Sequence, residues 1–273
     1  MTFNWDETEY IQRAKSIVIH DLFVKTADEN YLTARWCFKQ KLQIDFKWLA
    51  LHALEKYLKA ALLINGESAK SYSHKLLAAF HALQKIAGSL LPDPDSLIES
   101  LLQRLESYGN SHNRYNLYGN VHGSAELDAL DLSVFAIRRL ICPLNEISDS
   151  GQTHRCDLGV DPNFRFSKQN CPLDLALVDH EHPLYDVACD RNMPFASANY
   201  QHSDPSNWSI AASSSTIEVM ILNPMAGAQC EADARVAASL TDWLISNVIL
   251  SDYDKAELKS AKKATFSRLC ISH

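Results

Sequence analysis

Apolar side chains recur every three or four positions through a long segment between about residues 29 and 63. That spacing predicts a helix with one stripe facing a core. Gly66 follows the segment where a helix C-terminal cap is expected. In the second half of the segment the stripe consists of Ala50, Ala53, Leu54, Tyr57, Leu58, Ala61 and Leu62.

Further segments of the first half have the same helical pattern. Ser73 is placed to cap a helix that ends at Gly88. The pattern resumes over residues 95–105 and again over residues 126–144. The first half therefore predicts a bundle of four or five helices joined by short loops.

The character of the chain changes at residues 147–151, a polar, turn-prone stretch with the sequence ISDSG. We place a domain boundary there, with residues 1–148 as a helical bundle and residues 149–273 as a second region of unknown role. In that region the β-branched segment 216–222 predicts a strand.

Two helices are predicted to close the chain, over residues 232–250 and 254–267. Prolines recur between residues 162 and 205, so we expect irregular structure with short elements there. The sequence as a whole predicts a mainly α protein whose C-terminal region is smaller, less regular and of α+β type.

Composition narrows the function classes. The chain has 273 residues, 47% of them hydrophobic, a net charge of -7 and a pI near 5.9. An acidic protein lacks the broad basic face that extended duplex binding needs, although a small phosphate site fits this charge. We see no signal peptide or membrane span, so we expect a cytoplasmic protein without membrane contact. Seven cysteines without paired spacing favour reduced thiols.

The charged residues inside the stretch ALEKYLKAALLING, residues 53–66, have a plain interpretation. Glu55 lies four residues before Lys59, the orientation that stabilises an exposed helix by about 0.2–0.5 kcal/mol. Lys56 lies on the flank of the same helix and can lay its stem on apolar surface. We interpret these charges as a solvated helix face.

The same stretch resembles a known family. Residues 53–60, ALEKYLKA, are similar to the second-helix signature of HEPN domains, the nucleotide-binding helical domains of higher eukaryotes and prokaryotes. The segment SHKL at residues 73–76 and the segment NRYN at residues 113–116 resemble two later motifs in the same order. The resemblance covers residues 29–145, about one small domain.

This resemblance implies an up-and-down bundle of four or five helices, commonly a homodimer, that binds nucleotides or RNA. It places a nucleotide or RNA phosphate near Lys56, Lys59, Arg114 and Tyr115. It also implies a nucleotidyltransferase-type antitoxin as partner, in a toxin–antitoxin or defence system. We expect a binding or interaction module.

The alternative is a metal-independent RNA endonuclease. In the ribonuclease branch an Arg is followed after four to six residues by a His, which supplies a cation and a near-neutral proton carrier. Here Arg114 is followed at that distance by Gly119, and the next histidine is His122. Arg114 and His122 are the catalytic candidates under this alternative. The competing interpretation is that Arg114 pairs with an acid or caps a helix end and that His122 is an ordinary loop histidine.

Metal and cofactor signals are weak, and we expect neither. The second region is rich in zinc-type ligands, but their spacing matches no known finger or ribbon. These ligands are His154, Cys156, Cys171, His180, His182, Cys189 and His202.

The basic run at residues 255–268 can contact RNA or an acidic partner, or it can simply form a solvated terminal face. A third hypothesis places the function in residues 151–273.

Overall fold

Helices make up most of the structure, which confirms the expected mainly α class. A single antiparallel pair joins β1 (Glu146–Ile147) to β2 (Thr153–His154) among the described residues, with Glu146 opposite His154. The computed structural model describes residues 7–88, 91, 97–108, 125–141, 146–147, 153–154, 171–196 and 221–271.

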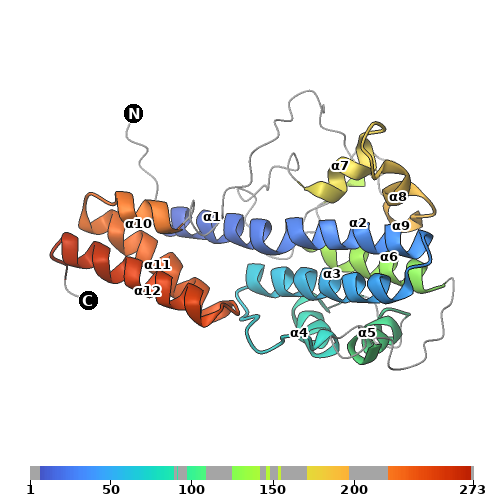
Figure 1. The fold of residues 1–273 in the computed structure, drawn as a ribbon, viewed down its shortest axis with the longest axis horizontal. Coiled ribbons are helices and arrows are strands. Elements are labelled where there is room, and N and C mark those ends of the chain that lie inside the picture. The colour runs from blue at the N-terminus through green and yellow to red at the C-terminus, as the bar shows by residue number, and fades with distance from the viewer. Residues whose placement is uncertain are drawn as a thin grey trace.

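One long helical path runs through the N-terminal part (Figure 1). It consists of α1 (Glu7–Ile19), a π-helical segment (His20–Val24) and α2 (Lys25–Lys39). The backbone at both joints has right-handed helical angles, so the chain passes from one element to the next without a turn.

The predicted helix over residues 29–63 is in fact two helices. α2 ends at Lys39, and α3 (Gln43–Ile64) runs back along it. The break lies at Lys41, whose φ of 62° is left-handed. The prediction of one continuous helix was therefore wrong.

The turn is closed by main-chain hydrogen bonds. The N–H of Lys41 donates to the carbonyl of Phe38 at 3.0 Å, and the N–H of Leu42 donates to the carbonyl of Cys37 at 2.8 Å. This pair of bonds is the Schellman arrangement, which normally places glycine at the left-handed position. With lysine there, the sequence carries no glycine or proline to mark the break.

α3 occupies the centre of the N-terminal part. Most of its apolar side chains are buried, as expected of a helix covered by neighbours on several sides. The neighbours include α2, α4 (Leu76–Ala87), α5 (Leu97–Tyr108) and α6 (Ala125–Arg138). Figure 1 shows α4 and α5 on the opposite side of α3 from α2.

The predicted helix ends are partly correct. Gly66 has a φ of 82° and its N–H donates to the carbonyl of Leu63 at 3.1 Å, which confirms it as the cap residue of α3. Ser73 does not cap the next helix, because α4 begins only after Lys75, without a side-chain cap bond. α6 is shorter than predicted, since the chain leaves the helix after Arg138.

α7 (Pro172–Val178), α8 (Tyr185–Cys189) and α9 (Met193–Ala196) lie against α2 and α6 (Figure 1). Leu173 and Phe195 are buried in the same core as α2 and α3. Residues on both sides of the predicted boundary near residue 148 thus contribute to one core.

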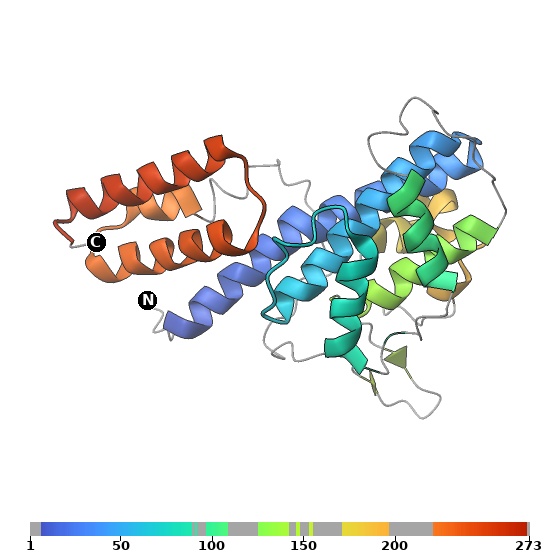
Figure 2. The ribbon, with the colours of Figure 1, turned by 90° about the horizontal axis from the view of Figure 1, so that it is seen from below.

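The last three helices gather beside α1, at one end of the molecule (Figure 2). They are α10 (Asn223–Gly227), α11 (Glu231–Asn247) and α12 (Asp252–Arg268). α11 and α12 confirm the two predicted closing helices.

The predicted strand over residues 216–222 is wrong where it can be compared. Ile221 and Leu222 lie in a π-helical turn before α10, and the other five residues lie outside the described ones. Within the part of the chain that the structure describes, every helix falls short of the length or apolar character that crossing a bilayer requires.

Candidate functional site

The structure describes only some of the predicted site residues. Lys56 and Lys59 lie on α3 and are described. Arg114, Tyr115 and His122 lie outside the described residues, in the gap between α5 and α6. The nucleotide site and the catalytic pair predicted on them stay predictions.

Glu55 and Lys59 form the predicted pair, with Lys59 Nζ 2.5 Å from Glu55 Oε1. The interpretation of a solvated helix face was wrong, however, because Glu55 is only 8% exposed and Lys59 9%. The spacing of four residues correctly indicates which side chains meet. It contains no information about the chain segment before α4, which brings His74 onto Glu55.

Two histidines converge on the other oxygen of the Glu55 carboxylate. His74 Nδ1 lies 2.7 Å and His52 Nδ1 lies 3.8 Å from Glu55 Oε2. The His52 ring is nearly perpendicular to the Trp48 ring, with 4.2 Å between centroids and 81° between planes. One donor atom from each of His52, Glu55 and His74 can be chosen so that all three lie within 4.8 Å of one another. No motif in the sequence points to His52.

Lys56 points to a different neighbour. Its Nζ lies 3.5 Å from the carbonyl oxygen of Thr26 on α2. Burial lowers the pKa of Lys56, and the charges of Glu29 and Glu55 only partly oppose this shift. Lys56 and Lys59 therefore interact with different partners and do not converge on a common site.

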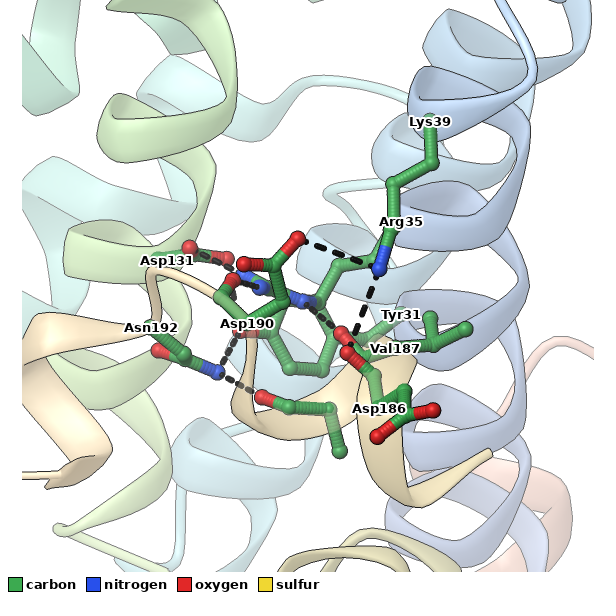
Figure 3. Close-up of polar contacts among 9 residues, drawn as sticks. Tyr31, Arg35, Lys39, Asp131, Asp186, Val187, Asp190 and Asn192 are labelled. Atoms are coloured by element: carbon green, nitrogen blue, oxygen red, sulfur yellow. Dashed lines mark hydrogen bonds and ion pairs between the residues drawn. The ribbon is translucent and has the colours of Figure 1, made fainter. Parts of the chain in front are cut away.

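A buried arginine joins α8 and the loop after it to the bundle (Figure 3). Arg35 on α2 pairs with Asp131 on α6 and donates to the carbonyls of Val187 at 2.8 Å and Asp190 at 2.5 Å. Tyr31 donates to Asp131 at 2.7 Å. Burial, followed by the charge of Asp131, raises the pKa of Tyr31 well above its ordinary value.

A second buried network centres on Asp28. Its carboxylate accepts hydrogen bonds from Arg138, Tyr57 and the main-chain N–H of Leu173. Arg138 also donates to Asp174 at 3.1 Å. Because these groups are buried and hydrogen-bonded to one another, the two networks fix helices in place and offer no reacting group to solvent.

The zinc-type ligands of the second region do not converge in the part that is described. Cys171 Sγ lies 3.0 Å from His20 Nε2. His20 comes 151 residues earlier in the chain and is not one of the predicted ligands. Cys189 donates weakly to the carbonyl of Leu177, and His182 accepts from the N–H of Leu184. Among the described residues, the group with metal-ligand geometry is instead that of His52, Glu55 and His74.

The predicted basic run forms one side of an open depression between α11 and α12. The depression has a volume of about 530 Å³. Lys262 pairs with Asp242 across it, with Nζ 2.8 Å and 2.6 Å from the two carboxylate oxygens. Its lining comprises Thr241, Asp242, Ile245, Ser246, Lys259, Lys262 and Lys263.

Comparison with known proteins adds no relative. The chain matches no family model, no curated protein and no solved structure at a significant level.

Proposed function

We propose that this protein is a HEPN-like helical module that binds RNA or a nucleotide without cleaving it. The HEPN-like part of the proposal rests on the sequence resemblance of residues 29–145, and the observation that carries the binding part is the basic depression between α11 and α12. Three lysines and one carboxylate line it. Its volume of about 530 Å³ lies within the usual range of small-ligand sites.

The charge of the depression favours phosphate. Lys262 is neutralised by Asp242, which leaves Lys259 and Lys263 to attract an anion. These two residues are four apart on α12, so both side chains project from the same helix face. Both are exposed. Lysine ammonium groups bind phosphate as point charges and release counterions on doing so.

The position of the site differs from the one implied by the HEPN resemblance. Lys59 is occupied by Glu55, which reduces the charge available near Lys56. We therefore place the described part of the anion site on α12, and keep Arg114 and Tyr115 as a second contact. A homodimer and a nucleotidyltransferase-type antitoxin are further parts of the proposal that rest on the resemblance alone.

Binding of a fluorescent single-stranded oligoribonucleotide, measured by anisotropy in EDTA, tests the proposal. Replacing Lys259 and Lys263 together with Gln is expected to weaken binding about tenfold or more and to reduce the slope of log K against log salt by about 1.4. The matched control replaces Lys41 and Lys85, two exposed lysines outside the depression, with Gln. Equal loss in both variants, or no binding by the wild type, would contradict the proposal.

The length of the RNA after incubation with the wild type, Arg114→Ala or His122→Ala tests the nuclease alternative. RNA recovered intact after incubation supports a binding module. Cleavage that disappears in Arg114→Ala and in His122→Ala would instead establish the metal-independent endonuclease.

A further inference from the structure

We propose that His52, Glu55 and His74 form a binding site for a divalent transition-metal ion of the zinc class. The three residues share no member with the basic depression, so the site is independent of the proposed RNA binding. Two imidazoles and one carboxylate are a ligand set that zinc and its neighbours in the first transition row accept, whereas magnesium and calcium prefer oxygen ligands alone.

The distances fit this coordination. Ligands about 2.0–2.2 Å from a tetrahedral zinc ion lie roughly 3.3 Å from one another. The Glu55 Oε2 atom lies 2.7 Å from His74 Nδ1 and 3.8 Å from His52 Nδ1, on either side of that spacing. A metal ion would replace the His74–Glu55 contact and change these two separations by about half an ångström each. The remaining pair of donor atoms, one on each histidine, lies within 4.8 Å.

The surroundings hold two ligands and leave the third adjustable. The perpendicular ring contact with Trp48 orients the His52 ring, and Glu55 is largely buried on α3. The side chain of His74 is 57% exposed and precedes α4, so it can move by the required amount. This exposed side also gives an ion access from solvent.

Lys59 acts as an outer partner of the carboxylate. Its ammonium group holds Glu55 Oε1 at 2.5 Å, which directs Oε2 toward the histidines. Metal-ligating carboxylates are commonly hydrogen-bonded in this way. The positive charge of Lys59 also repels the ion, so we expect an affinity below that of a structural zinc site. Three protein ligands leave a coordination position for water.

Cobalt titration of the full chain, stripped with EDTA and then desalted, tests the site. Visible absorption of Co²⁺ reports its coordination number and geometry, the His74→Gln variant assigns the ligand, and displacement by Zn²⁺ gives the zinc affinity. We expect one ion per chain for the wild type and an affinity at least tenfold lower for His74→Gln. Because His74 is exposed, this variant is expected to fold, which circular dichroism checks.

His81→Gln is the matched control. His81 also lies near a carboxylate, with Nε2 3.3 Å from Glu99 Oε1, and its side chain is 43% exposed, but it is not part of the group. It should retain wild-type binding. Native alkylation beforehand blocks accessible thiols such as Cys230, and a thiolate-to-cobalt band in the near ultraviolet would reveal cysteine ligands.

Absence of cobalt binding by the wild type would overturn the proposal. So would undiminished binding by His74→Gln, or equal loss in His74→Gln and His81→Gln. Loss of RNA binding in the lysine variants has no bearing on this outcome, because those lysines are not ligands.

Discussion

The guanidinium group of Arg138 holds both oxygens of the Asp28 carboxylate, with Nε 3.0 Å from Oδ1 and Nη2 3.1 Å from Oδ2. The same carboxylate accepts the hydroxyl of Tyr57 and, at 3.1 Å, the N–H of Leu173. One buried side chain on α2 thus connects α3, α6 and α7. All these donors lose their acceptor together if the carboxylate is removed.

Asp28→Ala is expected to lower the free energy of unfolding by about 3–5 kcal/mol, because it leaves Arg138 buried with less compensating charge. Urea denaturation followed by tryptophan fluorescence measures this. Glu231→Ala breaks the exposed pair with Arg235 on α11 and should cost less than about 1 kcal/mol. Similar losses in the two variants would show that the Asp28 network adds little to stability.

Lys56 should make stability depend on pH in the alkaline range. Burial lowers its pKa in the folded state, so between that pKa and the ordinary value of 10.5 the unfolded chain binds more protons. The free energy of unfolding therefore rises with pH in that window and carries a constant penalty below it.

The measurement is the difference in unfolding free energy between wild type and Lys56→Met. The stability of the wild type relative to the variant should increase as the pH rises through the lowered pKa of Lys56 toward 10.5. Lys85→Met, on the exposed face of α4, controls for the loss of a lysine as such. A difference that stays constant or shrinks with pH would contradict the expected shift.

The two left-handed cap residues of α2 and α3 should respond oppositely to substitution. Lys41→Gly relieves about 1–2 kcal/mol of backbone strain and adds about 0.5–1 kcal/mol of chain entropy cost, so a gain of about 0.5 kcal/mol is expected. Gly66→Ala should cost about 1 kcal/mol. A Cβ at Gly66 would meet no atom within 4 Å, so this cost isolates the backbone.

Thermal or urea unfolding measures both variants. A loss of stability in Lys41→Gly would mean that the lysine side chain itself stabilises the turn.

Thiol reactivity should separate the described cysteines by burial. Cys37 is buried, and burial followed by the charge of Asp45 raises its pKa. Cys230 is exposed. Iodoacetamide at about pH 8 should therefore label Cys230 rapidly and Cys37 only after local unfolding. Peptide mass spectrometry over time checks this, and equal labelling rates would show that α2 opens readily.

Sequence periodicity predicts helices here better than it predicts turns. α11 and α12 begin and end within a few residues of their predicted bounds, because amphipathic spacing is a local property. The turn after α2 was missed because Lys41 adopts a conformation for which glycine is the usual signal. The layout of the bundle implied by the HEPN resemblance stays a prediction.

The candidate metal site was beyond sequence reasoning for a different reason. His52 and Glu55 are one helical turn apart, but His74 comes 19 residues after Glu55. Only the return of the chain before α4 brings it to the carboxylate. The burial of Lys59 has the same origin, since neighbouring elements decide which face of a helix is covered. The basic run on α12, by contrast, was visible because its lysines repeat on one helix.

The Asp28 network also has a consequence for biosynthesis. Arg138 follows Asp28 by 110 residues and Leu173 follows it by 145. At ribosomal speeds of about 5–20 residues per second, a nascent chain carries Asp28 for on the order of ten seconds before these partners are made. Before then Tyr57 can donate to the carboxylate, but its charge is not yet paired with Arg138 and stays hydrated, so α2 and α3 close fully over it only late in translation. Slowing translation between residues 140 and 170 should therefore prolong the period in which this hairpin is open to chaperones and proteases.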